Sequence, residues 1–203
     1  MKWDAMPTEV ELNATVEGIK KRGIDVIVVN SSKEALDKVI GLIPKCSEVS
    51  NGSSTTLREI GFIDYLKSGE HGWRNLHEEM LNEKDEDRQD DLRRKCDTAE
   101  YFLGSVNAIA RTGELVAVDA SGSRVSAYPF AAKKVILVAG IQKIVPALDD
   151  AMRRVREHVF PQEDARAMKV YGAHSTLGKW VIIERELQEG RIMLILVKEK
   201  LGF

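Results

Sequence analysis

Cysteine is scarce in this chain of 203 residues, which contains only Cys46 and Cys96. The two residues do not form a CxxC pair, and this absence excludes the common zinc and iron–sulfur motifs as well as a framework of disulfides. We interpret both as reduced structural thiols, because free cysteines usually behave as small buried apolar residues.

Long apolar runs are also absent. No run reaches the roughly 18 residues that a membrane span requires, and the segment MKWDAMPTEVE lacks the apolar region of a signal peptide. We therefore expect a cytoplasmic protein. The charges nearly cancel, with 30 lysines and arginines against 32 aspartates and glutamates. This balance argues against binding to nucleic acid or to a membrane surface.

The motifs of several enzyme classes are missing as well. The chain has no G-x-S-x-G sequence for a serine hydrolase and no glycine-rich dinucleotide fingerprint. The segment GAHSTLGK at 172–179 differs from a phosphate-binding P-loop in its glycine spacing, and Trp180 follows its lysine. The four histidines do not show the spacing of metal ligands. We therefore expect neither a metal ion nor another cofactor.

What the sequence does contain is an alternation of apolar runs and amphipathic segments. Short apolar runs predict strands at 24–29, 46–49, 101–103, 115–118 and 135–139. Capping boxes predict helix starts at Thr8 with Glu11, at Ser31 with Glu34, and at Thr56 with Glu59, the last helix continuing to about Lys67. Strands that alternate with helices predict an α/β fold with a mostly parallel sheet and helices on both faces.

The last third of the chain contains one more helix pattern and two more strands. Apolar residues at 148–159 recur at helical spacing and predict a helix that ends at Pro161. Its arginines, Arg154 among them, are expected outside the core. The apolar runs at 180–183 and 192–197 predict a C-terminal β-hairpin, with two separate sheet strands as the alternative.

A charged segment interrupts the α/β pattern at about 70–98. Residues 83–97 mix acidic and basic side chains, which is typical of a solvent-exposed helix. We interpret this segment as a helical excursion from a single domain over 1–203. It is expected to cover the domain or to meet a second subunit in a homo-oligomer.

Ligands of open α/β sheets bind beyond the carboxyl ends of the strands, and this rule selects the loops that follow the predicted strands. These loops carry hydroxyl groups, backbone N–H groups, a guanidinium and an ammonium, which together suit an anionic small molecule. The predicted ligand-binding residues are Asn51, Gly52, Ser53, Ser54, Thr55, Asn107, Thr112, Asp119, Ser121, Gly122, Arg124 and Lys143.

Each of these groups also has an ordinary structural role. Arg124 suits a carboxylate or phosphate, Lys143 adds a point charge, and Asp119 is a candidate base. Alternatively, Arg124 pairs with Asp119, Lys143 is a solvated loop lysine, and Asp119 only begins a turn. The polar loop at 50–56 either contacts a ligand or only caps a helix. His174 lies in a second polar loop, which we interpret as a structural turn.

The central stretch at 101–145 resembles the lactate-utilisation (LUD) domain family. The matching segments are SVNAI at 105–109, VDASGSRV at 118–125, FAAKKVILVAG at 130–140, KIV at 143–145, and SNGSSTTLREIG at 50–61. The resemblance implies a fold like that of ribose-5-phosphate isomerase and the CoA transferases. It also implies an association with the oxidation of lactate to pyruvate in a multi-component system, but no established catalytic residue.

The chain departs from many relatives in two places. It lacks their C-terminal cysteine cluster, so the resemblance implies no iron–sulfur cofactor for this polypeptide. Arg111 stands where relatives commonly have a glutamate, which makes Glu114 the nearest substitute and, with Asp119, a catalytic candidate.

We expect a LUD-type protein that binds a small anionic metabolite such as lactate or pyruvate, with other lactate-oxidation components as candidate partners. The first alternative is an enzyme of the same fold that acts on a sugar phosphate, a CoA thioester or a folate. The second is a non-catalytic binding or assembly module.

Overall fold

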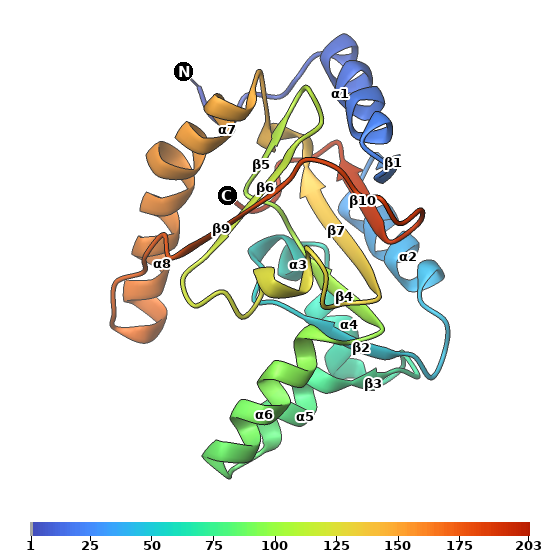
Figure 1. The fold of residues 1–203 in the computed structure, drawn as a ribbon, viewed down its shortest axis with the longest axis vertical. Helices are drawn as coiled ribbons and strands as arrows, with labels where there is room; N and C mark the ends of the chain where they lie inside the picture. Colours follow the sequence, from blue (N-terminus) through green and yellow to red (C-terminus); the bar gives the residue numbers. More distant parts are fainter. Residues whose placement is uncertain (1) are drawn as a thin grey trace.

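Two β-sheets organise the chain in the computed structural model, which describes residues 2–203 (Figure 1). The larger sheet has six strands, and every neighbouring pair in it is parallel. Its order is β1 (Asp25–Val29), β10 (Ile192–Val197), β7 (Lys134–Gly140), β4 (Tyr101–Gly104), β2 (Glu48–Asn51) and β3 (Arg74–Asn75). The predicted α/β fold with a mostly parallel sheet is confirmed.

The smaller sheet was not predicted as a separate layer. Its order is β8 (Ile144–Val145), β5 (Ala108–Ala110), β6 (Leu115–Asp119) and β9 (Lys179–Ile183), and β6 pairs antiparallel with both of its neighbours. The run at 115–118 is apolar on both faces, as in a parallel strand, because this sheet is covered on both sides. Periodicity therefore could not assign β6 to one sheet or the other.

Alternate residues of β7 show how the layers pack. Ile136 and Val138 face a cluster with α2 (Ser32–Leu42), α3 (Thr55–Glu59) and α4 (Phe62–Ser68). Val135, Leu137 and Ala139 belong to the opposite cluster, which α1 (Glu9–Lys21) and the inner face of the smaller sheet complete. Helices thus lie on both faces of the larger sheet, as predicted, with the smaller sheet sharing one face.

A long helical segment covers the outer face of the smaller sheet. It consists of α7 (Leu148–Arg154), a π-helical turn (Val155–Val159) and α8 (Phe160–Tyr171). The prediction that Pro161 ends the helix is wrong, because Pro161 lies in the first turn of α8. Proline lacks the N–H of a regular helical hydrogen bond, and the wide π-turn just before it accommodates that loss.

Arg154 does not lie outside the core, which is a second correction. Its side chain is fully buried, its Nε donates to Trp3 O at 2.9 Å, and its Nη1 donates to Asn107 O. The arginine therefore ties the N-terminal segment to Asn107, the residue before β5, through backbone carbonyls. Helical spacing wrongly predicted an exposed side chain for Arg154, because α7 is covered on more than one side.

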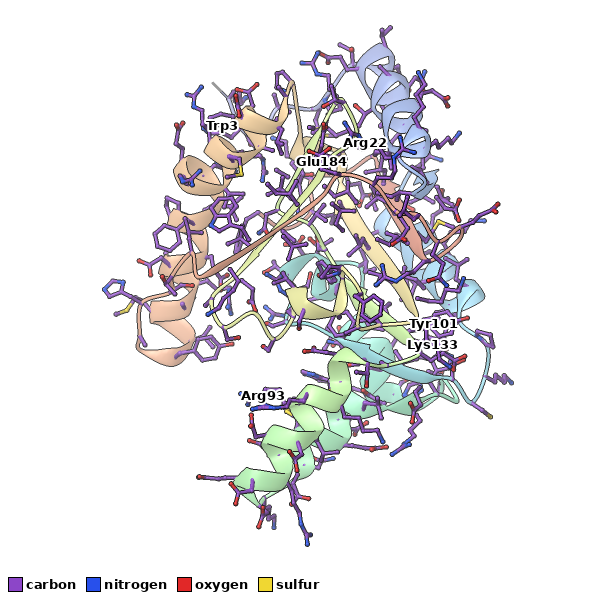
Figure 2. All side chains as sticks on the ribbon, in the orientation of Figure 1. Trp3, Arg22, Arg93, Tyr101, Lys133 and Glu184 are labelled. Carbon is purple, nitrogen blue, oxygen red and sulfur yellow. The ribbon has the colours of Figure 1, made fainter. Side chains whose placement is uncertain are left out.

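The C-terminal strands are both present, but they do not form a hairpin. β9 pairs with β6 in the smaller sheet, whereas β10 lies between β1 and β7 in the larger one. The chain between them crosses from one sheet to the other, so the alternative of two separate strands is correct. Figure 2 shows Arg22 and Glu184 together at this crossing, where their side chains form an ion pair at 2.9 Å.

The charged segment forms a helix pair that projects from the rest of the molecule (Figure 1). α5 (Leu76–Asn82) and α6 (Glu86–Asp97) share a small apolar cluster with Ala99. Both helices lie within the segment at about 70–98. Among residues 2–203, no helix is both long enough and apolar enough to span a membrane.

A glycine allows the turn between β5 and β6 to approach α1. Gly113 has a φ of 103°, and a Cβ there would lie 2.5 Å from the backbone carbon of Gly18. Gly41, in α2, has open space around its Cβ position and provides a matched comparison.

We predict that Gly113→Ala lowers the free energy of unfolding by about 2 kcal/mol or more, since it adds left-handed strain to a backbone clash. Gly41→Ala is expected to raise it by up to about 1 kcal/mol through helix propensity. Urea unfolding measures both values. Equal stability of Gly113→Ala and the parent chain would contradict the described approach of α1 to the turn.

Candidate functional site

A cavity of about 560 Å³ opens where the strands of the larger sheet end. Its lining includes the segments that follow β2, β4 and β7, which are neighbours in that sheet, and the segment that follows β6 in the smaller one. The π-turn, α8 and the segment after α8 form a further wall, and the helix pair α5–α6 also contributes lining residues. The cavity thus lies beyond the carboxyl ends of parallel strands, as the fold class predicts.

Most of the predicted ligand-binding residues line this cavity. They are Asn51, Gly52, Ser53, Ser54, Thr55, Asn107, Asp119, Ser121, Arg124 and Lys143. Gly122 is not among the lining residues; its N–H donates to Asp119 Oδ2 at 2.8 Å and so shapes the turn. Thr112 and Glu114 lie in the turn against α1, where Thr112 donates to Glu114 and Glu114 pairs with Arg22. The structure therefore does not bring Thr112 or Glu114 to the cavity.

The loop after β2 differs from its prediction in a way that matters for the site. Ser54, not Thr56, caps α3, since its Oγ accepts from Leu57 N at 3.2 Å. The helix ends at Glu59 instead of continuing to Lys67, because Gly61, with a φ of 82°, separates α3 from α4. A helix this short adds little dipole, but the shifted cap leaves the hydroxyl of Thr56 available to other partners.

Asn51 presents an unsatisfied acceptor in the same loop. Its side chain is buried, and its Nδ2 donates to Gly52 O at 3.3 Å. Its Oδ1 is buried and has no hydrogen-bond partner within the described part of the chain. Buried amide oxygens are normally paired, so this oxygen is a position where a ligand donor would be stabilised.

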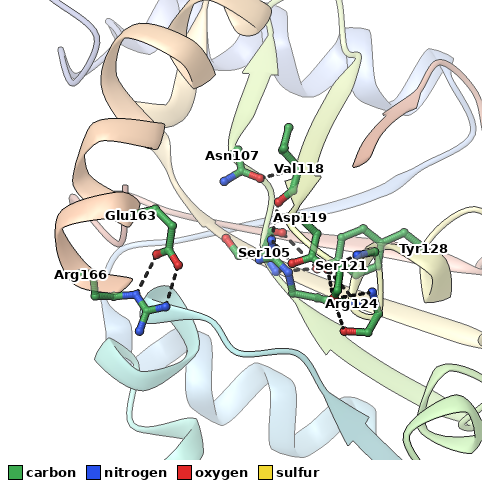
Figure 3. Close-up of polar contacts among 11 residues, drawn as sticks. Ser105, Asn107, Val118, Asp119, Ser121, Arg124, Tyr128, Glu163 and Arg166 are labelled. Carbon is green, nitrogen blue, oxygen red and sulfur yellow. Dashed lines mark hydrogen bonds and ion pairs between the residues drawn. The ribbon is translucent and has the colours of Figure 1, made fainter. Parts of the chain in front are cut away.

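The turn after β6 combines structural contacts with one cation (Figure 3). Asp119 Oδ2 accepts from Gly122 N at 2.8 Å and from Arg124 N at 3.3 Å, and Arg124 Nη2 donates to Val118 O. The guanidinium lies 3.8 Å from Asp119 Oδ1. The side chain of Arg124 also covers Gly52, where a Cβ would be 2.2 Å from Arg124 Cγ. Arg124 therefore joins the two polar loops.

Lys143 is the lining residue whose pKa lies furthest from its ordinary value. It ends a short 3₁₀ turn (Ile141–Lys143) after β7 and is 3% exposed, so the interpretation as a solvated loop lysine is wrong. Its Nζ donates to Thr56 Oγ1 at 3.1 Å, to Ser105 Oγ at 3.2 Å and to Val106 O at 3.1 Å. No carboxylate within residues 2–203 forms an ion pair with it.

The pKa of Lys143 is lowered to about 7. Desolvation by burial is the main cause, and the positive charges of Arg154 and Arg124 add to it, whereas the negative charge of Glu59 acts in the opposite direction. The pKa of Arg154 is itself lowered to about 10, again chiefly by burial. Lys143 and Arg154 are thus buried cations that form no ion pair within residues 2–203, and an anion beside Lys143 would offset its charge.

The far side of the cavity was missed by sequence reasoning. Arg166 and Glu163 of α8 form two parallel hydrogen bonds at 2.6 and 2.8 Å, which Figure 3 shows opposite Asp119. His174 Nδ1 lies 2.9 Å from Asp164 Oδ2 and lines the same wall. Asp97 of α6 lines the cavity too, and burial raises the pKa of its carboxyl. Charged residues on helices are usually solvated, so no signal in the sequence distinguished Glu163, Arg166 or Asp97. His174 was noted in a polar loop that we interpreted as a structural turn.

The side chains do not suggest a metal centre. Within residues 2–203, no three histidine, cysteine, aspartate or glutamate side chains come together as metal ligands do. The polar groups of the cavity are hydroxyls, amides and cations, together with the carboxylates of Asp97, Asp119 and Glu163. The hydroxyls, amides and cations suit organic anions.

Comparison with known proteins gives one family and a similar fold. The LUD domain family model matches residues 12–197. A crystal structure of a DUF162 family protein from Deinococcus radiodurans covers 94% of this chain and 99% of its own, at 13% identity and a TM-score of 0.55. The match to ribose 5-phosphate isomerase A from Neisseria gonorrhoeae covers 77% of this chain and 76% of the isomerase chain, at 12% identity and a TM-score of 0.36. No curated protein sequence matches.

We predict that Lys143→Met raises the melting temperature at pH 7 by about 3 °C or more, because it removes a buried charge that has no counter-ion. The single hydroxyl hydrogen of Ser105 can still be donated to either Thr56 Oγ1 or Val106 O, so one of these two acceptors keeps a partner in the variant. The gain should shrink as the pH rises from 7 to 10. The native lysine is already neutral above its pKa of about 7, whereas the unfolded one keeps its proton until about pH 10.

Melting curves recorded between pH 6 and pH 10 measure this difference. Lys33→Met is the control, because Lys33 is exposed and pairs with Asp37 at 2.8 Å. A Lys143→Met variant that melts well below the parent chain at pH 7 would show that Lys143 is a stabilising ion, contrary to this account.

Proposed function

The chain belongs to the LUD-domain family, and we propose that its cavity binds a small organic anion. Carboxylates with an oxygen substituent on the second carbon, such as lactate and pyruvate, are the first candidates. The observation that carries this proposal is the buried amine of Lys143, which has no carboxylate partner within residues 2–203.

The energetics favour an anion over a neutral ligand. A buried cation without a counter-ion is costly, and the cost falls when an anion enters at hydrogen-bond distance. Arg154 and Arg124 act in the same direction, since both lower the pKa of Lys143. Binding of an anion would therefore raise the pKa of Lys143, and protonated Lys143 would bind the anion more tightly.

The polar groups around the floor suit the rest of such a ligand. Arg124 supplies a planar donor group from the turn after β6, and Asn51 supplies an unpartnered carbonyl oxygen. A lactate hydroxyl is a donor for that oxygen, whereas a pyruvate carbonyl requires a donor such as a serine hydroxyl. The site therefore holds groups for both oxidation levels.

One observation favours a larger anion as the second candidate. A cavity of about 560 Å³ falls in the range of about 300–1,000 Å³ that takes drug-sized ligands, and lactate would fill only part of it. A sugar phosphate, a CoA thioester or a folate would use more of the wall formed by α8. In either case the anionic group is expected beside Lys143.

We predict that at least one anion among lactate, pyruvate, ribose 5-phosphate, CoA and a folate raises the melting temperature in a concentration-dependent way. Saturation at a hundredfold excess over Kd corresponds to about 2.7 kcal/mol of added stability. Lys143→Met should abolish the ligand-induced shift, and Arg124→Ala should weaken binding by about tenfold, as expected for a charge-assisted hydrogen bond.

Isothermal titration between pH 6 and pH 9 tests the same contact. The affinity should fall as the pH rises through about 7, because the ammonium then loses its proton. Lys33→Met is expected to bind as the parent chain does. The proposal is wrong if none of these anions raises the melting temperature of the parent chain. It is also wrong if an anion raises the melting temperature of Lys143→Met as much as that of the parent chain.

A further inference from the structure

The position of Lys143 suits a nucleophile as well as an anchor for charge. The side chain comes from a buried 3₁₀ turn directly after the central strand β7, so its backbone is held by the sheet. Lys143 lines the cavity, and its Nζ contacts two hydroxyls and one backbone carbonyl. These uncharged partners allow the amine to be neutral. A carboxylate partner would instead stabilise the protonated ammonium.

The hydrogen-bond partners fit the neutral amine in detail. A neutral amine has two N–H groups and one lone pair, whereas an ammonium has three N–H groups. The backbone oxygen of Val106 can only accept, but Ser105 and Thr56 can either donate or accept. The three contacts can therefore be satisfied in both protonation states. In the neutral amine the lone pair accepts from the hydroxyl of Ser105 or Thr56, and that hydroxyl must rotate away before the amine attacks.

We propose that Lys143 forms a Schiff base with the carbonyl carbon of an organic anion bound in this cavity. The substrate class is a carbonyl compound that also carries a carboxylate or a phosphate, such as a 2-oxo acid or an open-chain sugar phosphate. The proposal rests on the proposed function, since the anionic group places the carbonyl beside Nζ. It goes beyond the proposed function because the contact between Lys143 and the bound anion becomes a covalent bond.

The step balances without an oxidant or a reductant. The lone pair of Nζ attacks the carbonyl carbon, the C–N bond forms, and one proton passes from nitrogen to oxygen to give a carbinolamine. Protonation of its hydroxyl then releases water, and loss of the remaining N–H proton leaves the imine. Ser105 and Thr56 lie 3.2 and 3.1 Å from Nζ and are the groups placed to relay these protons.

The electrostatics of the site support this chemistry. An amine must be neutral to attack, and nearby cations and burial favour that state. The pKa of Lys143, about 7, leaves a large neutral fraction at physiological pH. In contrast, Asp37 raises the pKa of Lys33, so Lys33 stays protonated. A trapping reagent should therefore distinguish the two lysines.

The test is reductive trapping with cyanoborohydride at pH 7, with pyruvate and ribose 5-phosphate as separate arms. We expect one covalent adduct per chain with at least one of them, and peptide mapping should place it on Lys143. Labelling of Lys143 should exceed that of Lys33 by roughly tenfold or more, given the difference in neutral fraction. Lactate is the matched control, because it carries the same carboxylate as pyruvate but a hydroxyl in place of the carbonyl.

Variants separate charge from nucleophilicity. Lys143→Arg keeps a cation and should retain part of the thermal shift with pyruvate or ribose 5-phosphate, but it cannot form the adduct. Lys33→Met should be trapped as efficiently as the parent chain. Ser105→Ala is expected to slow trapping while the thermal shift remains, since Ser105 acts as a proton relay.

Three results would overturn the inference. A thermal shift without any trapped adduct would leave anion binding in place and remove the covalent step. Equal labelling of Lys143 and Lys33 would show that the amine is not activated. The absence of both a thermal shift and an adduct with every compound would remove the covalent step together with the proposed function.

Discussion

The structure of the cavity depends on burying the amine of Lys143 without a counter-ion. Its Nζ contacts Thr56, Ser105 and the carbonyl of Val106, and the positive charges of Arg154 and Arg124 lower its pKa further. Such an arrangement costs stability, because desolvation penalises the charged form. Groups that are costly to the fold and strongly perturbed in pKa cluster at functional sites. This constraint is why the cavity indicates a function more clearly than any motif does.

The rest of the fold places partners around this amine. The strand order brings the carboxyl ends of β7, β4 and β2 together, so that Lys143, Ser105 and Thr56 meet from three distant parts of the chain. The smaller sheet adds the turn with Arg124, whose side chain covers Gly52. α7 adds the buried guanidinium of Arg154, whose charge lowers the pKa of Lys143. The two sheets together therefore make the site, and neither would do so alone.

Local signals were sufficient for much of the fold. The capping box of Thr8 and Glu11 depends on neighbours in sequence and was predicted correctly, as was the apolar strand at 135–139. Long-range packing determined what was missed: the burial of Lys143 and Arg154, the smaller sheet, and the separation of β9 from β10. The polar loops after β2 and β6 were found because a rule of topology, not a motif, selected them. The residues of α6 and α8 had no comparable signal.

In the free protein Lys143 is expected to lose its proton near neutral pH, and a bound anion is expected to raise the pKa of Lys143. Nuclear magnetic resonance of the lysine side-chain amine, assigned by comparison with Lys143→Met, measures that titration directly. We predict a midpoint of about 7 in the free protein and a higher midpoint in the presence of the anion that stabilises the protein most. A midpoint near the ordinary lysine value of about 10.4 in the free protein would contradict the account.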